Sequence, residues 1–218
     1  MLVLASASAR RLMLLRNWGF RPEVIEVSVS ETLDQDIDPR EGVKLLAERK
    51  ALAGVAKWRK LGGKPEDLVL GADTMVVLER LILGKPKTPA EAREMLQLLS
   101  GRQHLVLTGV AIIRLNGERE LAVVETAVNF HKLSEDQIKT YVSTGEPMDK
   151  AGAYAIQGEA HDFVESYSGS LTNVIGLPME YVFEKLKTWG ISQENIALRE
   201  VDHGIPSSER LTGGIISP

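Results

Sequence analysis

Short runs of apolar residues alternate along this chain with longer stretches in which apolar positions recur at helical spacing. The short runs predict strands at 2–4, 67–72, 74–79, 104–115 and 118–130. The last two flank Asn116-Gly117, a dipeptide typical of a tight hairpin turn. These strands therefore include an antiparallel pair.

Helices are predicted at 39–60, 89–99, 134–143 and 178–189. The first two begin with Asp-Pro-Arg-Glu and Thr-Pro-Ala-Glu, which have the form of a capping box with proline at the first helical position. Strands and helices mix throughout. We therefore expect an α/β fold with a mixed central β-sheet flanked by helices.

The composition narrows the class of protein. The 218 residues suit one large domain or two small lobes that share a core. No apolar run approaches the ~20 residues that span a bilayer, and the N-terminus has no pattern of a signal peptide. The absence of cysteine excludes disulfides and thiolate chemistry. A net charge of −4 argues against general nucleic-acid binding. We expect a cytoplasmic protein that binds neither nucleic acid nor membrane.

The periodic pattern fades towards the C-terminus. Residues 1–190 are expected to form the functional domain. Residues 191–218 are polar and contain Gly, Pro and Ser, so we expect a C-terminal extension that is partly flexible.

The segment LVLASASARR at residues 2–11 is typical of an anion-binding site. It predicts a buried strand, a loop of small residues and a helix that Ser8 caps and Arg10 and Arg11 open. Helix N–H groups and two guanidinium groups suit a phosphate. The alternative is an ordinary strand–turn–helix with two solvated arginines, since helix starts favour acidic residues.

Other candidates lie outside the periodic apolar positions. Asp73 follows a buried run and is expected at the end of a strand, where it meets a cation or metal or else caps a turn. Lys85 lies in a Gly/Pro loop, and Lys50 lies among apolar helix positions, where it could equally be a snorkelling surface lysine. Gln157, between apolar residues and a glycine, is either a base-reading amide or an ordinary loop residue. The four histidines lack metal-ligand spacing and are interpreted as structural or surface groups.

Together these segments resemble the Maf family of nucleoside triphosphate pyrophosphatases. The motifs that carry the resemblance occur in order over residues 1–189: LASASARR, the lysine in LAERKA, GADT, GKPKTPAEAREML, SGRQHLVLTGVAI, TGEPMDKAGAYAIQG and GSLTNVIGLP. Two positions depart from the usual family pattern. Ala9 replaces a proline before the two arginines, and Leu171 stands where tyrosine is common.

The resemblance implies a two-lobed fold similar to that of inosine triphosphatases, with a nucleotide cleft. It implies cleavage of a triphosphate between its α- and β-phosphates, as a house-cleaning reaction, with Mg²⁺ or Mn²⁺. It nominates Asp73 as the base that activates water, with Glu31 and Asp73 as metal ligands. It places the substrate on Ser8, Arg10, Arg11, Lys50, Thr74, Lys85 and Gln157. A homodimer is left open.

Gln157 and Thr74 indicate which class of nucleotide base the substrate carries. Glutamine offers one acceptor and one donor, which matches the N3–H and a carbonyl of uracil or thymine. The family's sister subgroup, which acts on 7-methyl-GTP, tends to carry glutamate at Gln157 and glutamine at Thr74. This chain therefore resembles the dTTP/UTP subgroup.

Two other functions are weighed against this one. A nucleotidyltransferase also acts at an α-phosphate, but it needs a second substrate and a more glycine-rich loop. A nucleotide-binding regulator of septum formation would not need the carboxylates of a metal and a base. Pyrophosphate release from nucleotide alone separates these alternatives.

Overall fold

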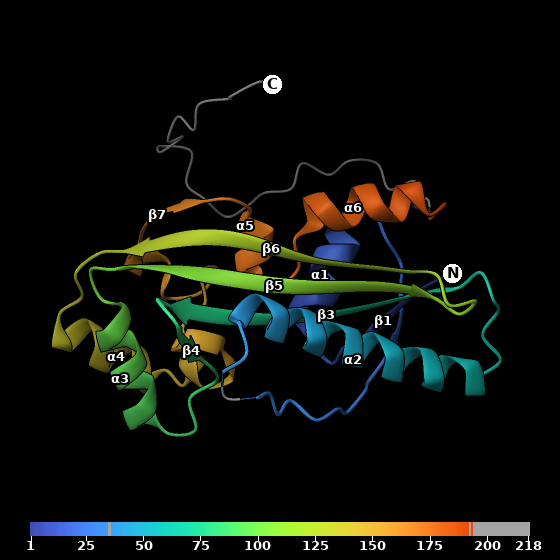
Figure 1. The fold of residues 1–218 in the computed structure, drawn as a ribbon. Helices are drawn as coiled ribbons and strands as arrows, with labels where there is room; N and C mark the ends of the chain where they lie inside the picture. The colour runs from blue at the N-terminus through green and yellow to red at the C-terminus, as the bar shows by residue number, and fades with distance from the viewer. Residues whose placement is uncertain (35, 192, 194–218) are drawn as a thin grey trace.

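The structure, a computed structural model, describes residues 1–34, 36–191 and 193, and within them one mixed β-sheet carries helices on both faces (Figure 1). The strands are β1 (Leu2–Ala5), β2 (Glu23–Ile25), β3 (Leu68–Leu78), β4 (Leu81–Leu83), β5 (Gln103–Arg114), β6 (Arg119–Phe130) and β7 (Val164–Ser168). The helices are α1 (Ala9–Asn17), α2 (Pro39–Lys60), α3 (Pro89–Leu99), α4 (Glu135–Ser143), α5 (Leu171–Ile175) and α6 (Met179–Thr188). Short 3₁₀ turns are η1 (Glu146–Asp149), η2 (Ala151–Ala153) and η3 (His161–Phe163).

The sheet has the order β2-β1-β3-β5-β6-β7, with β4 also on β3. Strand β1 runs parallel to β2 and β3, and the other pairs are antiparallel. Helices α1 and α2 provide the crossovers that parallel strands require. The predicted α/β class with a mixed sheet is confirmed.

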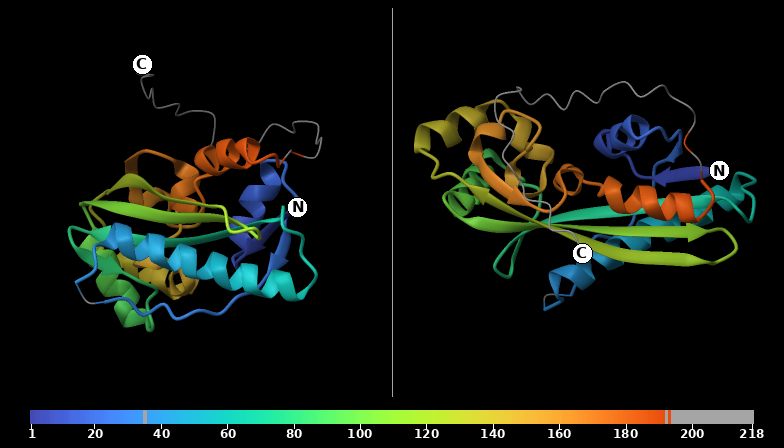
Figure 2. Two further views of the ribbon diagram at one scale, coloured as in Figure 1. Left: turned by 45° about the vertical axis from the view of Figure 1, so that its right-hand side comes forward. Right: turned by 90° about the horizontal axis from the view of Figure 1, so that it is seen from above.

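Alternation along the strands separates the two faces of the sheet. Leu2 and Leu4 of β1 belong to the core that contains α1 and α6, whereas Val3 and Ala5 belong to the core that contains α2. Successive strand residues point to opposite faces, so each strand serves both cores. Figures 1 and 2 show α2 along one face, with α1, α5 and α6 on the other.

Two glycines bring α2 unusually close to the sheet. A Cβ on Gly71 of β3 would lie 2.6 Å from the carbonyl oxygen of Ala47, and one on Gly109 of β5 would lie 2.3 Å from that of Val43. A real Cβ atom essentially never comes within 3.0 Å of another heavy atom, so only glycine permits this spacing. The helix backbone therefore rests directly on the strands.

The prediction that Asp73 lies at a strand end is wrong. Residues 67–72 and 74–79 were expected as separate segments, but β3 continues without a break from Leu68 to Leu78. Asp73 pairs in register with Gly109 of β5, and Thr74 pairs with Thr108. The polar residues interrupt the apolar pattern, not the strand, because the ladder with β5 satisfies their backbone groups.

The predicted hairpin and the four predicted helices are all present. The caps differ in detail. Asp38 caps α2, but Glu41 pairs with Lys44 instead of reaching back to the cap. At α3, Thr88 is the cap and Glu91 accepts from the N–H of Lys87.

Strands β2, β4 and β7 and helix α5 were not predicted. The expected extension 191–218 lies almost wholly outside the described residues.

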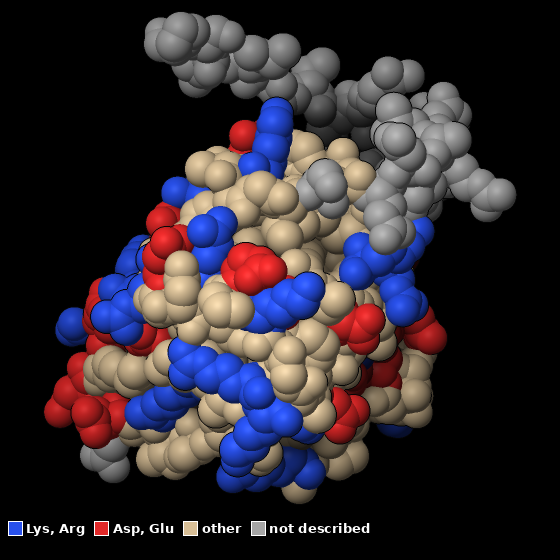
Figure 3. Space-filling model, turned by 90° about the vertical axis from the view of Figure 1, so that its right-hand side faces the viewer, with Lys and Arg blue, Asp and Glu red and all other residues tan. Residues whose placement is uncertain are grey.

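Charge is distributed in both signs over the end of the molecule at which α2 terminates (Figure 3). Lys57, Arg59 and Lys60 occupy the last turn of this helix, where cations favour the helix dipole. Within the described part of the chain, no helix is both long and apolar enough to cross a membrane.

Candidate active site

A gap in the sheet creates a large cavity. On the side of β3 away from β5, β1 pairs with residues 68–70 and β4 with residues 76–78. In the described structure no strand covers residues 71–75 on that side. The edge of β3 is therefore open at Asp73 and Thr74, and side chains from both faces of the sheet reach one cavity of about 490 Å³.

The structure brings all nine sequence-predicted site residues to this cavity. They are Ser8, Arg10, Arg11, Glu31, Lys50, Asp73, Thr74, Lys85 and Gln157. They come from the loop and first turn of α1, the segment before α2, helix α2, strand β3, the segment after β4 and the segment after η2. Their chemical roles are taken up below as a proposal.

Lys50 joins the two carboxylates. Its Nζ lies 2.5 Å from Oδ1 of Asp73 and 2.8 Å from Oε1 of Glu31. The side chains of Lys50 and Asp73 are largely buried, whereas that of Glu31 is exposed. The hydrogen bond from Lys50 is the main reason that the pKa of Glu31 lies below its ordinary value. Of the two sequence interpretations, the snorkelling lysine is wrong.

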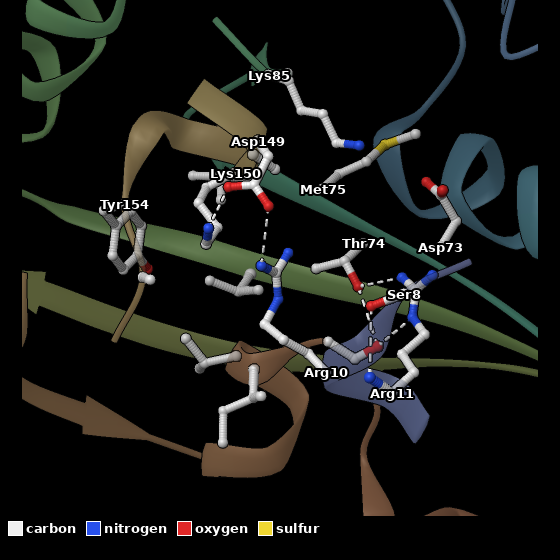
Figure 4. Close-up of a pocket in the computed structure, with 18 of the residues that line it drawn as sticks. Ser8, Arg10, Arg11, Asp73, Thr74, Met75, Lys85, Asp149, Lys150 and Tyr154 are labelled. Carbon is white, nitrogen blue, oxygen red and sulfur yellow. Dashed lines mark hydrogen bonds and ion pairs between the residues drawn. The ribbon is translucent and has the colours of Figure 1, made fainter. Parts of the chain in front are cut away.

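Arg11 is held by neutral acceptors (Figure 4). Nε donates to the carbonyl of Gly176 at 2.8 Å, NH2 to the hydroxyl of Thr74 at 3.1 Å and NH1 to the hydroxyl of Ser6 at 3.5 Å. Each terminal nitrogen keeps a second N–H without a partner among the described residues. Burial lowers the pKa of Arg11, and the nearby Asp73 opposes this shift. The guanidinium stays protonated and can offer two N–H groups to one phosphate.

The start of α1 faces the same space. Ser8 is the N-cap, as predicted, and its hydroxyl accepts from the backbone N–H of Arg11. The first turn of this helix contains no acidic residue. A helix start that lacks acidic side chains and carries arginines suits an anionic ligand.

Asp149 and Lys150 also line the cavity, although the sequence analysis assigned them no role. Asp149 forms ion pairs with Lys150 and with Arg10, the latter at 3.4 Å (Figure 4). The Lys150 side chain is largely buried, whereas that of Asp149 is exposed. A signal was present in the sequence, since both charges directly precede the small-residue run AGA.

The segment that carries Gln157 is fixed at both ends. The N–H of Ala155 donates to the hydroxyl of Tyr141 at 3.2 Å, and the N–H of Glu159 donates to Oε2 of Glu146 at 3.0 Å. Gln157 itself is exposed and lines the cavity. Its amide is therefore available to a ligand.

The loop of Lys85 is tied to the segment that precedes Gln157. The N–H of Gly152 donates to the carbonyl of Gly84 at 3.0 Å. Lys85 is exposed, and Figure 4 shows its amine directed towards Met75 and the cavity. A cation from this loop thus faces Arg11 across the open edge of β3.

The donor set fits a hard divalent cation. Asp73 and Glu31 contact the same Nζ atom of Lys50, at 2.5 and 2.8 Å. The two contacting oxygens can therefore be no farther apart than the sum of these two distances. Mg²⁺ is commonly bound by one or two carboxylates and completes its shell with water and substrate phosphates. Among the described residues, no cluster of three or more His, Cys, Asp or Glu side chains forms a ready-made metal cage. Two carboxylates in a cavity lined by cations fit a Mg²⁺ ion that completes its shell with water and substrate phosphates.

The histidine prediction can be checked at three positions. His104 is buried, and its Nε2 lies 2.8 Å from the hydroxyl of Tyr154, a residue of the cavity wall. His131 and His161 are exposed. All three are structural or surface groups, as predicted, whereas His203 lies outside the described residues.

Fold and cavity together define an α/β protein with a cation-lined cavity at a gap in a mixed sheet. Residues 1–189 match the protein family described as Maf-like protein. A dTTP/UTP pyrophosphatase from Desulfitobacterium hafniense (strain Y51) is 55% identical over 207 residues, which cover 95% of this chain and 93% of the relative. The chain belongs to the Maf family.

More distant relatives have the same name. The dTTP/UTP pyrophosphatases of Syntrophus aciditrophicus (strain SB) and Thermococcus kodakarensis (strain ATCC BAA-918 / JCM 12380 / KOD1) are 47% and 48% identical over 190 residues, or 87% of this chain and 90% and 97% of theirs. A solved nucleoside-triphosphatase, the dITP/XTP pyrophosphatase of Mycobacterium abscessus, is 12% identical, with a TM-score of 0.41 over 85% of this chain and 93% of that one. The fold assignment therefore depends on the sheet topology and not on this likeness.

Proposed function

We propose that this protein hydrolyses nucleoside triphosphates with uracil or thymine bases, giving the monophosphate and pyrophosphate. Water adds to the α-phosphorus, the bond to the α–β bridging oxygen breaks, and pyrophosphate leaves. Several relatives that cover nearly the whole chain carry the name dTTP/UTP pyrophosphatase. The observation that carries the proposal is the open edge of β3, where Asp73 shares one cavity with four cations from three other segments.

The cations are suited to bind the triphosphate. Such a chain carries about four negative charges, and phosphoryl transfer is catalysed mainly by positioning and charge stabilisation. Arg10 and Arg11 approach from α1, Lys50 from α2 and Lys85 from the loop after β4. Four cations from three segments can contact different phosphates and hold the α-phosphorus beside Asp73.

Asp73 is suited to accept the proton of the attacking water. Its carboxylate lies on the open edge of β3, with one oxygen paired to Lys50. Glu31 and Asp73 are the residues that would hold Mg²⁺ or Mn²⁺, which when bound supplies positive charge to the phosphate oxygens. Since one carboxylate cannot bind a metal tightly and act as a strong base at once, we assign Asp73 mainly to proton transfer and make Glu31 the stronger of the two metal ligands.

The base is expected at the end of the cavity formed by Tyr154, Ile156 and Gln157. The two apolar side chains provide a surface for a planar ring. The amide of Gln157 can accept from N3–H and donate to a carbonyl of uracil or thymine. Both bases present this pair of groups, whereas the Watson–Crick edge of guanine presents two adjacent donors.

The test is a stoichiometric assay of the full chain with Mg²⁺ or Mn²⁺ and a panel of UTP, dTTP, CTP, GTP and ATP. The proposal requires one pyrophosphate per UMP and no inorganic phosphate. Pyrophosphate release that needs a second substrate would assign a nucleotidyltransferase. Binding without turnover would assign a nucleotide-sensing regulator. Either result overturns the proposal.

The proposed function is accompanied by expectations about cellular location, oligomeric state and domain boundaries. We expect the protein in the cytoplasm, where its nucleotide substrates are found, and cell fractionation tests this. A homodimer is tested by light scattering of the purified chain. Truncation at residue 190 tests whether residues 1–190 suffice for activity and residues 191–218 are dispensable.

A further inference from the structure

Three hydrogen bonds link the cavity to the interior of the sheet. NH2 of Arg11 donates to Oγ1 of Thr74 at 3.1 Å, Oγ1 of Thr74 lies 3.0 Å from Oγ1 of Thr108, and the Thr108 hydroxyl donates to the carbonyl of Asn173 at 3.2 Å. Thr74 and Thr108 are direct partners in the β3–β5 register. The chain of bonds thus runs from α1 through two strands to α5.

The two ends of this chain favour one direction for the protons between them. A guanidinium has only donors and a carbonyl has only lone pairs, while each hydroxyl between them has one proton. When the Thr108 hydroxyl donates to the carbonyl of Asn173, its oxygen accepts the proton of Thr74. Thr74 therefore accepts from Arg11 and donates to Thr108. Towards a ligand in the cavity, its oxygen is left with acceptor capacity only.

Thr74 has one other acceptor nearby, and Arg11 already uses it. The carbonyl of Gly176 lies 3.4 Å from Oγ1 of Thr74 and accepts from Nε of Arg11 at 2.8 Å. Without the hydroxyl of Thr108, the proton of Thr74 would have only this carbonyl to bond, and Thr74 would rotate towards it. We expect that rotation to change the oxygen position at which Thr74 accepts from Arg11.

We propose that Thr108, which is fully buried and does not line the cavity, is a positioning residue that acts on Arg11 through Thr74. The proposal builds on the proposed function, because Arg11 is there assigned to the triphosphate. The fixed hydroxyl chain holds the guanidinium so that its two unpartnered N–H groups face the phosphate. Preorganisation of this kind lowers the cost of binding and orienting the substrate.

The chain offers a matched control in Thr126 of β6. Thr126 is also fully buried, donates its hydroxyl to the carbonyl of Ser170 at 3.0 Å and accepts from the side chain of Asn173 at 3.0 Å. It makes no hydrogen bond to Arg11 or Thr74. Valine in place of either threonine removes one buried hydroxyl with little change in volume, so the two variants differ mainly in what the hydroxyl reaches.

The first experiment compares Thr108→Val, Thr108→Ser and Thr126→Val by kcat/KM for UTP and by Tm. We expect Thr108→Val to lose about 10- to 100-fold in kcat/KM, the range for displaced catalytic geometry. Thr108→Ser keeps the hydroxyl and should stay within a few-fold of the wild type. Thr126→Val should lower Tm with little change in kcat/KM. Equal kinetic losses in both valine variants would reduce Thr108 to a stability residue.

A double-mutant cycle tests the route through Thr74. If Thr108 acts through Thr74, Thr74→Val and the double variant Thr74→Val/Thr108→Val should have the same kcat/KM, because the second change has nothing left to disturb. Additive losses would contradict the proposal. Should Thr108→Val fail to fold, Thr108→Ala removes the same hydroxyl without adding a methyl group in its place and takes its position in the cycle.

A binding measurement separates this inference from the proposed function. Inorganic pyrophosphate is titrated calorimetrically into the wild type, Thr108→Val and Thr126→Val. Weaker binding in Thr108→Val alone supports the positioning role even if no triphosphate is hydrolysed. If the wild type hydrolyses UTP and Thr108→Val matches it in both binding and kcat/KM, the positioning role is wrong while the proposed function stands.

Discussion

The ammonium nitrogen of Lys50 lies 2.5 Å from Oδ1 of Asp73, although the two residues are 23 positions apart on different elements. Lys50 comes from the face of α2 that rests on the sheet, and Asp73 is in the middle of β3. Their separation depends on the close contact that Gly71 and Gly109 allow between helix and strands. Packing of the fold therefore sets the position of the proposed base.

Replacing the proposed base should stop turnover while the fold is kept. Asp73→Asn has the same size but cannot take a proton from water. Loss of a general base typically costs about 10²–10⁴-fold in rate. Pyrophosphate release and Tm are measured for this variant and for Asp136→Asn, a control with the same substitution at an exposed position outside the cavity. Near-normal activity in folded Asp73→Asn would remove Asp73 from the reaction.

The cations should act on all nucleotides alike, because each nucleotide has the same triphosphate. Alanine at Arg10, Arg11, Lys50 or Lys85 should cost about 1.5–3 kcal/mol, or roughly one to two decades in kcat/KM. Lys87→Ala, two residues beyond Lys85 and outside the cavity wall, is the matched control and should have little effect. If one of these variants changed base preference without changing overall efficiency, the replaced residue would no longer be assigned to triphosphate binding.

Base preference should respond to Gln157 and not to the cations. Gln157→Glu replaces the amide donor with a second acceptor, which would face a carbonyl of uracil. A repulsive, unpaired contact costs more than a missing one, so UTP and dTTP hydrolysis should fall selectively and Gln157→Ala should lie between. The ratio of kcat/KM for UTP over GTP decides the matter. An unchanged ratio would place Gln157 outside base recognition.

Stability should fall in mild acid because of His104. Burial lowers the pKa of this ring from 6.5 to about 4. As the pH drops from about 6.5 towards 4, the unfolded chain gains a proton on this ring that the folded protein does not, so the free energy of unfolding decreases by about 3 kcal/mol. Urea unfolding of wild type and His104→Gln at about pH 7.5 and about pH 4.5 isolates this effect.

In that comparison the variant loses the bond to Tyr154 at both pH values but lacks the titration. The stability difference between wild type and variant should therefore shrink by about 2–3 kcal/mol at the lower pH. The exposed His131→Gln should show no such change. A pH-independent difference would mean that the ring titrates normally in the folded protein.

Much of the site could be predicted from the sequence because its residues interrupt apolar patterns. Arg10 and Arg11 open a helix where acidic residues are usual, and Asp73 breaks a buried run. Local sequence could not show that β3 continues through Asp73, since its partner on β5 is distant along the chain. The polarity of Asp73 suggested a strand end, whereas hydrogen bonding between β3 and β5 continues the strand through this residue.

The residues behind the site were missed for the same reason. Thr108 is a single polar residue in the run LVLTGVAI, and nothing local says that it opposes Thr74. Register fixes that pairing, and register depends on the whole β3–β5 ladder. The ion pair between Asp149 and Arg10 could not be predicted from local sequence either, because the two residues are 139 positions apart.

Because the cavity at the open edge of β3 is built from distant parts of the chain, ligand binding there requires the complete native fold. Residues from 8 to 176 contribute to one cavity, so no early or late fragment of the domain contains it. A ligand of this cavity binds only the native state and stabilises every element together. At a concentration of 100 Kd it adds about 2.7 kcal/mol to the free energy of unfolding. Protection from proteolysis should therefore extend to segments far from the nucleotide, including the β5–β6 hairpin turn.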